Sequence, residues 1–540
     1  MSAGILREFS LPEDTDTIFL HPEPSKWRPL LVRNRQIVES VPRRSKSSRE
    51  LLAAARGYTQ RLLGPGRPGP PGNIDFCAAT GHQAIWHHCG ILAKDFAVHD
   101  LARAAGGFAL HLILDHDVRD TAMVLPARDS DNALHFQKIQ IESEQKPVPL
   151  EFRPLPPKNL LQTLVRAVTK IGPATLCGQI WPKDDALRNM DLSRFANIAD
   201  FITYSQAMLK DALGLGNIVY LPVSMLCRTD AFAGFLNSTI PDAEAFAAAY
   251  NNAIDKHLAT RHLAGRPPIR KLKIDTSQGL IELPFWVVSP AARRSSLHVR
   301  TAKAGQVGIG TGSAELVSLD PASLSEDAGR VRKALRRLGY VLRPKAVPLT
   351  LFARLFLADW FVHGLGGAEY EPVTDRIIRD YYRIEPPAFG VATCTMTLNA
   401  KNQPAPPEPG VSQLTRTLRD IRHNPEKYID QAVRKTPAVA SLIGSKTQLV
   451  AKAADRSLPA AARSSAYASL AAVNKRLLEY ARTAAERAEE QMALYRRNAL
   501  SKEVAHHREF FFGLFPQERL AETAGSLTFG GEHCRSEPLG

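Results

Sequence analysis

The sequence predicts an α/β protein with a parallel sheet in its core and a helical arm near the carboxyl end. Between residues 74 and 114 an apolar strand, Ile74–Ala79, precedes a helix, Ile91–Ala105, and a second strand, Phe108–Leu114. This order forms a crossover between parallel strands, whose carboxyl ends are where ligands bind. Beyond residue 410 the composition changes to Ala, Arg, Glu and Leu, and apolar residues recur at helical spacing.

The length and composition of the chain predict a folded protein of two or three structural units. Of the 540 residues, 44% are hydrophobic and 23% are charged, which is typical of globular proteins. The longest apolar run, Leu349–Val362, is interrupted by Arg354 and Asp359 and is too short to span a membrane. Residues 1–16 carry four acidic residues and no apolar segment of the kind that secretion signals have. We therefore expect no membrane partner and a cytoplasmic location.

The net charge limits the expected partners, and the cysteine spacing limits the expected metal sites. The net charge of +15 favours anionic partners, but the 69 basic residues are spread along the chain, so phosphate-bearing small molecules and nucleic acid both fit. The six cysteines include no CxxC pair, so we expect free thiols and no zinc ribbon.

Two Pro/Gly-rich stretches, Leu63–Gly72 and Asn402–Gly410, divide the chain. The expected parts are an N-terminal segment and linker (1–72), an α/β core with inserted connecting segments (73–401), a helical coiled-coil arm (411–500) and a C-terminal segment docking on the core (501–540). Within the core we expect further strands at Ile218–Leu221 and Phe285–Val288 and helices at Ala243–Ala259 and Leu349–Val362.

The arm is predicted from apolar residues that alternate in steps of three and four. They are Leu470, Val473, Leu477, Tyr480, Ala484, Ala488, Gln491 and Tyr495, preceded by Leu414, Leu418 and Ile421. Such a seam is typical of a helical hairpin or a coiled coil. A dimerisation or lever arm and a helical domain that only packs on the rest of the chain explain it equally well.

The first polar cluster is TGHQAIWHHCGILAKD, Thr80 to Asp95. A strand, a Thr-Gly turn and a helix would let the backbone at Gly81 and Gly90 approach an anion, with Lys94 one helical turn further on. His82, His87 and His88 could contact phosphates or transfer protons near neutral pH. A metal site is weaker, because it needs a third ligand from elsewhere, and histidines that only cap and pack are an alternative.

The second cluster is DHDVRD, Asp115 to Asp120, at the end of the second strand. Asp115 and Asp117 flank His116, an arrangement that suits Mg²⁺ or ribose hydroxyls or could orient the histidine for acid–base chemistry. A solvated acidic loop is the alternative.

The third cluster is HGLGGAEYEPVTD, His363 to Asp375, which we expect at the end of an apolar helix. Its glycines Gly364, Gly366 and Gly367 could turn backbone N–H groups toward a phosphate, with His363, Glu369 and Tyr370 contacting the rest of a ligand. A glycine-rich helix C-cap is the alternative. The segment has no GKS or GKT and is not a P-loop.

The order of these motifs resembles the cysteine ligase family of bacillithiol biosynthesis, whose members are thought to add cysteine to glucosaminyl malate. That family has a TGQQ-type turn followed by a glycine and a lysine, an EDHD segment, a GGPAE-type loop and an LYPxxxLQER-like end. The similar residues here are Thr80, Gly81, His82 and Gln83 with Gly90 and Lys94; Asp115, His116 and Asp117; Gly366 to Glu369; and Leu514 to Arg519. His82 stands where the family has glutamine.

The resemblance implies a Rossmann-like core, a helical dimerisation arm and an active site spanning His82, Asp115, His116 and Glu369. We expect a ligase or transferase that joins an amine or thiol compound to a small-molecule acceptor, with ATP or ADP, and Mg²⁺, as candidate cofactors. In this reading His82 and His88 stabilise developing charge, and Asp115 with Asp117 orients His116 or binds Mg²⁺.

Two alternatives to the ligase stay open. A nucleotidylyltransferase would share the fold. A nucleic-acid-binding or scaffolding protein would use the basic surface, but no Lys/Arg cluster interleaved with aromatic residues supports it, so nucleic acid is not an expected partner. A homodimer formed through the helical arm is the expected assembly.

Overall fold

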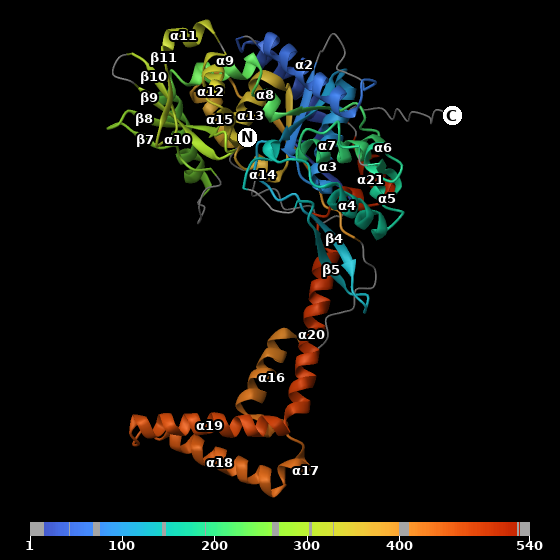
Figure 1. Ribbon diagram of the computed structural model, residues 1–540, viewed down its shortest axis with the longest axis vertical. Helices are drawn as coiled ribbons and strands as arrows, with labels where there is room; N and C mark the ends of the chain where they lie inside the picture. The colour runs from blue at the N-terminus through green and yellow to red at the C-terminus, as the bar shows by residue number, and fades with distance from the viewer. Residues whose placement is uncertain are drawn as a thin grey trace. The chain divides into compact units, whose positions relative to one another are not determined.

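The structure is a computed structural model in which the chain forms two compact units (Figure 1). It describes residues 16–42, 44–67, 76–142, 147–189, 191–261, 269–301, 305–327, 329–398, 410–525, 527 and 529. Unit 1 comprises Met1–Leu125, Lys138–Thr397 and Arg508–Gly540, and unit 2 comprises Pro126–Gln137 and Leu398–His507. Residues 68–72 and 402–409 of the expected linkers, and Ile74 and Asp75 of the first expected strand, lie outside the described residues.

A six-stranded sheet forms the centre of unit 1. Its order is β1 (Ile18–His21), β14 (Phe389–Cys394), β13 (Trp360–His363), β2 (Cys77–Gln83), β3 (Phe108–Leu114) and β6 (Val219–Pro222). All neighbours pair in parallel except β1, which runs antiparallel to β14. The mixed α/β class is therefore confirmed. The chain builds outward from β2 in both directions, first through β3 and β6 and later through β13 and β14.

The β2–α3–β3 segment follows the sequence prediction closely. The helix α3 (Cys89–Ala105) ends at Gly106, which adopts the left-handed conformation with φ 69° that glycine favours at helix C-termini. The strand Phe108–Leu114 is confirmed. The expected Thr-Gly turn is wrong, because β2 continues through Thr80 and Gly81 to Gln83 and pairs with β3 along its whole length.

Only the first part of the expected helix Leu349–Val362 is helical; the last part is a strand. The helix α13 (Ala346–Phe352) passes into a π-helix, η3 (Ala353–Leu357), and the chain then enters β13. The Asp359 carboxylate fixes this change, since it accepts a hydrogen bond of 2.8 Å from the backbone N–H of Cys77 and one of 3.0 Å from Arg44. Periodicity alone does not distinguish a buried helix from a buried strand in such an apolar run.

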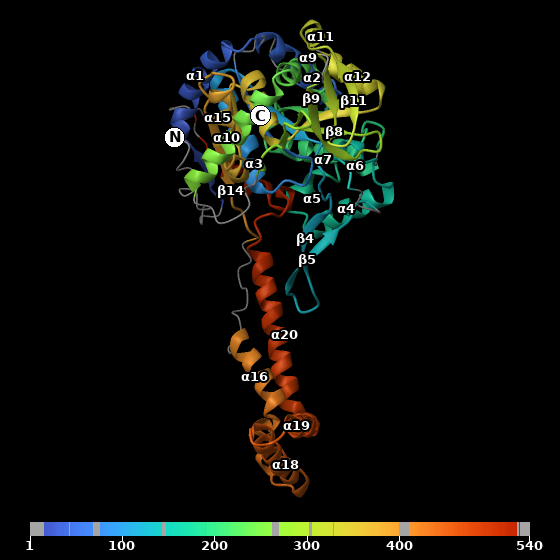
Figure 2. The same ribbon diagram turned by 90° about the vertical axis from the view of Figure 1, so that its left-hand side faces the viewer.

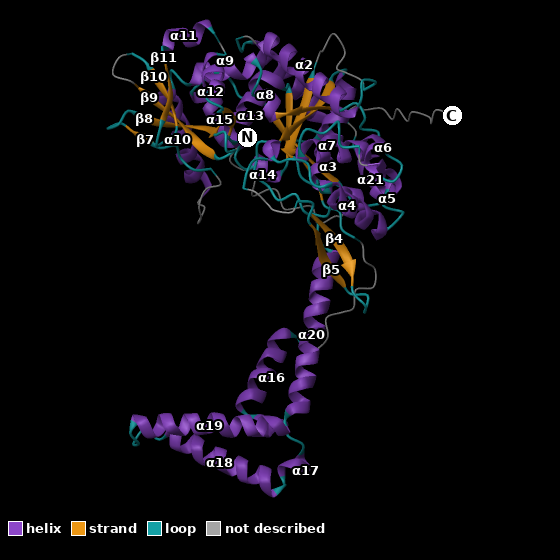
Figure 3. Cartoon of the chain, viewed as in Figure 1, coloured by secondary structure: helices purple, strands orange, loops and turns teal. Residues whose placement is uncertain are grey.

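Helices and a second, antiparallel sheet complete unit 1 (Figure 3). That sheet has the order β11 (Glu315–Leu319), β10 (Val307–Gly310), β9 (Arg294–Thr301), β8 (Leu280–Val288) and β12 (Val341–Pro344), with β7 (Ile274–Asp275) beside β8. The strands β4 (Met123–Arg128) and β5 (Leu134–Ile139) pair in a two-stranded sheet, of which Pro126–Gln137 belong to unit 2. The helices before residue 262 are η1 (Pro24–Lys26), α1 (Trp27–Glu39), α2 (Arg44–Leu63), η2 (Leu150–Phe152), α4 (Lys158–Ile171), α5 (Leu176–Ile180), α6 (Asp185–Asn189), α7 (Ile198–Ala212), α8 (Val223–Leu226), α9 (Asp230–Thr239) and α10 (Ala243–Arg261). The later ones are α11 (Pro321–Glu326), α12 (Arg330–Arg337), α14 (Leu365–Ala368), α15 (Glu371–Asp380), η5 (Phe512–Leu514) and α21 (Gln517–Gly525).

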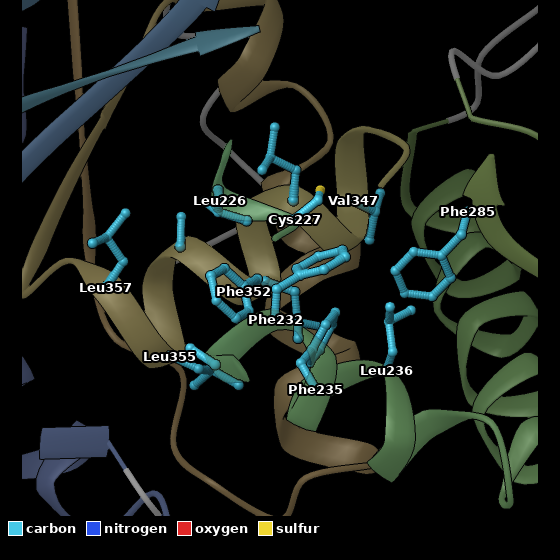
Figure 4. Packing of buried hydrophobic residues seen from close by; sticks show 14 of the residues in the cluster. Leu226, Cys227, Phe232, Phe235, Leu236, Phe285, Val347, Phe352, Leu355 and Leu357 are labelled. Atoms are coloured by element: carbon cyan, nitrogen blue, oxygen red, sulfur yellow. The ribbon is translucent and has the colours of Figure 1, made fainter. Parts of the chain in front are cut away.

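One hydrophobic core joins the two larger sheets. Leu110 and Leu221 of the parallel sheet and Phe285 and Val299 of the second sheet belong to a single buried cluster. Figure 4 shows part of it, where Phe232 of α9 contacts both Phe285 of β8 and Phe352 of α13. A core shared in this way holds the ends of the parallel strands in a fixed position.

Unit 2 is mostly helical. Its helices are α16 (Val411–His423), η4 (Pro425–Tyr428), α17 (Gln431–Arg434), α18 (Pro437–Ala454), α19 (Ala460–Tyr480) and α20 (Arg482–Ala505). Both views show α18 alongside α19 and α16 alongside α20 (Figures 1 and 2). The apolar seam predicted from Leu470 to Tyr495 spans two helices, because α19 ends at Tyr480 and α20 begins at Arg482. Across both units, no described helix has the length and apolar character needed to cross a membrane.

The segment after unit 2 returns to unit 1. Phe510, Phe511 and Phe512 are buried, and the backbone N–H of Phe512 donates to the carbonyl of His87 at 2.8 Å. The five cysteines among the described residues, Cys77, Cys89, Cys177, Cys227 and Cys394, are free and buried, as expected for thiols without CxxC pairs.

Candidate functional site

The three polar clusters of the sequence follow strands that end at the same edge of the parallel sheet. Thr80 to Gln83 form the end of β2, Asp115 to Asp117 follow β3, and His363 ends β13. Because β13, β2 and β3 are neighbours in parallel register, their carboxyl ends lie side by side. The edge between β2 and β13 is also the point from which the chain builds outward in two directions.

Lys94 connects the first cluster to the third. Its side chain is only 3% exposed, and its Nζ donates to the carbonyl oxygen of Gly81 at 2.7 Å. A Cβ placed on Gly364, directly after β13, would lie 3.9 Å from Cδ of Lys94. Burial lowers the pKa of Lys94 to about 8, so the amine is still largely protonated at neutral pH. We call Gly81, His82, Lys94, His363 and Gly364 the lysine site.

The two histidines of the lysine site are neutral. Burial, followed by the charge of Lys94, lowers the pKa of His82 well below its ordinary value. Burial also lowers the pKa of His363, with contributions from the charges of Arg354 and Lys94. A neutral imidazole carries one N–H donor and one acceptor, so these groups can form hydrogen bonds and accept protons but add no positive charge.

A buried carboxylate lies next to His363. Glu371 Oε1 is 3.3 Å from His363 Nε2, and the other oxygen of Glu371 accepts a short hydrogen bond from Arg354. Burial raises the pKa of Glu371 to about 7. The sequence predicts a role for Glu369, which is half-buried and follows α14, whereas the carboxylate that contacts His363 is that of Glu371, two residues further on.

The residues of β2 that were expected to approach a ligand instead hold the sheet together. The hydroxyl of Thr80 is fully buried and donates to the carbonyl of Val362 at 2.8 Å, which ties β2 to β13. A Cβ on Gly81 would lie 3.0 Å from Cβ of Leu112 and 3.1 Å from its carbonyl oxygen. Gly81 therefore packs closely against β3, where a side chain would crowd Leu112.

The start of α3 is also closed to an anion. His88 is the N-cap, and its Nδ1 accepts the N–H of Gly90 at 3.1 Å. A Cβ on Gly90 would lie 2.9 Å from Oγ1 of Thr393 and 3.0 Å from the carbonyl of Cys394, since the helix packs on the end of β14. His88 therefore caps α3, as in the capping alternative, while the expected roles of Gly90 in phosphate binding and of His88 in catalysis stay predictions.

A group of buried titratable residues lies behind β2, and most of it was missed in the sequence. Nδ1 of His111 is 2.6 Å from Asp95 Oδ1, and Nζ of Lys210 is 2.7 Å from Asp95 Oδ2. The His87 ring stacks on His111 with centroids 5.5 Å apart. Burial opposes ionisation of Asp95, but Lys210 and His111 keep its pKa well below the usual range. Burial lowers the pKa of both histidines.

The residues after β3 make bonds that differ from those expected. Oδ1 of Asp115 accepts the N–H of Ser224 at 2.9 Å and Oδ2 accepts the Ser224 hydroxyl, so neither oxygen orients His116. Burial and the charge of Glu151 raise the pKa of Asp115 to about 7. Burial lowers the pKa of His116 to about 3, and its Nδ1 has no hydrogen-bond partner among the described residues.

Asp117 connects the second cluster to the first. One of its oxygens accepts from Gln83 Nε2 at 3.2 Å, and the other accepts from Arg294 at 3.2 Å. Its carboxylate is thus shared between β2 and the second sheet. Among the described residues no group of three or more His, Cys, Asp or Glu side chains has an arrangement suited to a metal ion.

The glycine loop follows a strand rather than the expected helix. Gly364 precedes the short helix α14, and a Cβ on Gly366 would meet nothing within 4 Å. A Cβ on Gly367 would lie 2.7 Å from Nδ1 of His363, so Gly367 is required for packing. The Tyr370 ring contacts the His363 ring edge-on, with centroids 6.5 Å apart, and lies behind the loop.

In comparisons with known proteins, no family model matches the chain and no curated protein matches it. The lysine site is therefore described by its own geometry.

Several buried charged groups of this region come together only through the fold. They are Asp95 with His111 and Lys210, and Arg354 with Glu371. A charged residue within an apolar stretch is the signal that could have found them, because such a residue is buried only when it is paired.

Proposed function

We propose that the parallel sheet is a Rossmann-like core whose lysine site binds a phosphate-bearing small molecule, with ATP or ADP as the first candidates. The observation that carries this proposal is the buried amine of Lys94 between the ends of β2 and β13. The strand order β6–β3–β2–β13–β14 supports it, because the strand order reverses between β2 and β13. In open α/β sheets ligands bind in the crevice at such a reversal.

The residues of the lysine site fit a phosphate better than they fit an uncharged group. The charge of Asp95 favours the ammonium form of Lys94, but Asp95 is also paired with Lys210. Two buried cations therefore share one carboxylate, and an anion would compensate the excess positive charge. Gly364 and Gly366 leave the backbone of the loop uncovered by side chains at this edge. His82 would add a hydrogen-bond donor.

For chemistry we propose a ligase or transferase that joins an amine or thiol compound to a small-molecule acceptor, as the resemblance to the cysteine-adding family implies. ATP would transfer its γ-phosphoryl group to the carboxylate of one substrate and leave as ADP, and the amine or thiol of the other substrate would then attack the acyl phosphate and release inorganic phosphate. Lys94 would neutralise anionic oxygens. The His363–Glu371 pair, in which the carboxyl group has a pKa of about 7, would take up the proton that the attacking amine or thiol releases.

Mg²⁺ enters this proposal only together with the phosphates. The described residues form no three-ligand metal group, and both oxygens of Asp115 accept from Ser224. Mg²⁺ in nucleotide sites is commonly held by phosphates, water and one or two carboxylates. The carboxylate of Asp117 is the one to test for such a contact.

The binding claim is tested by isothermal titration of the full chain with ATP and with ADP, each with and without MgCl₂. We expect binding that falls at least about tenfold in Lys94→Met, because a charged hydrogen bond is lost. Lys256→Met, which removes a charge from the exposed face of α10, serves as the control and should bind normally. Equal binding by both variants would place the nucleotide elsewhere.

The reaction is tested with ATP, cysteine and glucosaminyl malate, following product formation by mass spectrometry. Product in the wild type and none in Lys94→Met is the expected result. If no product forms and neither ATP nor ADP binds, the ligase proposal is wrong. Binding without product would retain the site and reject this substrate pair.

We also propose that unit 2 is a coiled-coil arm through which two copies associate. Val450 and Tyr467 expose 46% and 60% of their surface on α18 and α19, and two copies could cover such side chains. Sedimentation velocity should give a dimer for the wild type and a monomer for the variant Tyr467→Glu/Val450→Glu. A wild-type monomer at micromolar concentration would contradict this assembly.

A further inference from the structure

A separate pocket of about 340 Å³ lies in unit 1 between η2, α9, α12 and β12. Its volume falls within the range of small-molecule sites. None of the residues that line it belongs to the lysine site. The pocket is therefore a second cavity with its own chemistry.

The floor of the pocket is apolar and rigid. Ala233, Leu236, Leu335 and Leu342 line it and are each at most 6% exposed. Leu236, Leu335 and Leu342 belong to the same hydrophobic core that joins the two sheets, and Figure 4 shows Leu236 together with Phe232, Phe235 and Phe285 in that core. Close packing behind the floor keeps the cavity from collapsing when it is empty.

The rim of the pocket is strongly basic. It contains Arg228, Arg332, Lys333 and Arg336. Arg332 is held by the carbonyl of Thr229 at 2.7 Å, and Lys333 by the carboxylate of Asp327 at 2.9 Å. The guanidinium groups of Arg228 and Arg336 are exposed and form no ion pair or side-chain hydrogen bond with any described residue.

The inner wall of the pocket carries a buried ion pair whose two charges cancel. Arg343 donates to Glu151 from Nε at 2.8 Å and from Nη2 at 2.6 Å, with both side chains buried. Since Arg343 and Glu151 satisfy each other, the charge available to a ligand is that of the rim. Arg332 and Lys333 are paired with Asp230 and Asp327, so the free charge of the rim is that of Arg228 and Arg336. Two free guanidinium groups over an apolar floor favour a ligand with an anionic end and an apolar body.

We propose that this pocket binds an organic anion, with a carboxylate or phosphate on Arg228 and Arg336 and a hydrocarbon or aromatic body on the floor formed by Ala233, Leu236 and Leu335. An inorganic anion would use the rim without the floor, and a neutral hydrocarbon would use the floor without the rim. Only a ligand with both parts uses the whole pocket. This site does not depend on the function proposed for the lysine site.

The test is isothermal titration of the full chain with octanoate, acetate, inorganic phosphate and neutral 1-octanol. Octanoate should bind at least about tenfold more tightly than each of the other three, because only octanoate contacts both rim and floor. The double variant Arg228→Gln/Arg336→Gln should lose about tenfold or more in octanoate affinity. Both arginines are exposed, so the fold should be retained.

The matched control is Arg337→Gln, which removes an equal charge from α12 at an exposed residue that does not line the pocket. Octanoate affinity should stay within about twofold of the wild type in this variant, since a charge that contacts no ligand contributes little. Octanoate binding no tighter than acetate, or an equal loss in the control and the double variant, would overturn the proposal. Failure of ATP to bind at Lys94 would leave it standing.

Discussion

The replacement Lys94→Met is predicted to stabilise unit 1 at neutral pH while it weakens ligand binding. Burial lowers the pKa of Lys94 from 10.5 in an unfolded chain to about 8. Below pH 8 the folded protein therefore holds a charged amine in a position that disfavours the charge. A residue with this effect on stability is expected at a site retained for function.

The size of the effect follows from the pKa. A change from 10.5 to about 8 corresponds to about 3 kcal/mol of destabilisation at pH 7, which disappears as the pH rises from about 8 to 10.5. Removing the amine also removes its hydrogen bond to the carbonyl of Gly81, worth about 1 kcal/mol. Lys94→Met should thus be about 2 kcal/mol more stable at pH 7 and about 1 kcal/mol less stable near pH 10.5.

The assay is urea unfolding followed by tryptophan fluorescence between pH 7 and 10.5. All five tryptophans, Trp27, Trp86, Trp181, Trp286 and Trp360, belong to unit 1, so their signal reports unit 1 alone. The control is Lys210→Met, which leaves Asp95 buried without its lysine and should cost about 3–5 kcal/mol. If Lys94→Met is less stable than the wild type at pH 7, or the difference does not change with pH, the reasoning about Lys94 is refuted.

The same unfolding assay checks three further changes. Arg354→Met should lower the free energy of unfolding by about 3–5 kcal/mol at pH 8, because it leaves the Glu371 carboxylate buried and unpaired. This loss should shrink toward pH 5, where Glu371 is protonated, since its pKa is about 7. A loss below about 1 kcal/mol at pH 8 would contradict the pair. Gly81→Ala should cost about 1–3 kcal/mol, because its methyl group would lie 3.0 Å from Cβ of Leu112, and a neutral result would show that β3 yields. Asp115→Asn should abolish a loss of about 4 kcal/mol that the wild type suffers as the pH rises from about 4 to 7, since the pKa of Asp115 is raised to about 7; an unchanged pH profile would contradict this.

The sequence predicted the parts of the fold in which local signals and tertiary packing agree. The helix after His88 and the strand Phe108–Leu114 have clear periodicity, and Gly106 marks where the helix stops. The run Leu349–Val362 was predicted wrongly in part because its apolar residues suit a helix and a strand equally. The hydrogen bonds of Asp359 to Arg44 and to the backbone of Cys77 favour the strand that follows. The strand order required pairings between residues more than 250 positions apart, such as Trp360 with Ala78.

The candidate site could be predicted by region but not by role. The sequence places Lys94 one turn into a helix and His363 at the end of an apolar helix, and the fold brings both to one edge of the sheet. Spacing in the sequence does not distinguish Glu369 from Glu371, because it does not reveal which carboxylate turns toward His363. His88 caps α3 through its hydrogen bond with the N–H of Gly90, and the sequence alone does not show whether a histidine makes such a bond.

The most direct test of the central claim is a crystal structure of the full chain grown with ATP and MgCl₂. The account predicts phosphate density within hydrogen-bond distance of the Lys94 amine, between the ends of β2 and β13. Nucleotide density that contacts neither Lys94 nor the loop at Gly364, or nucleotide bound only in the pocket lined by Arg228 and Arg336, would contradict it.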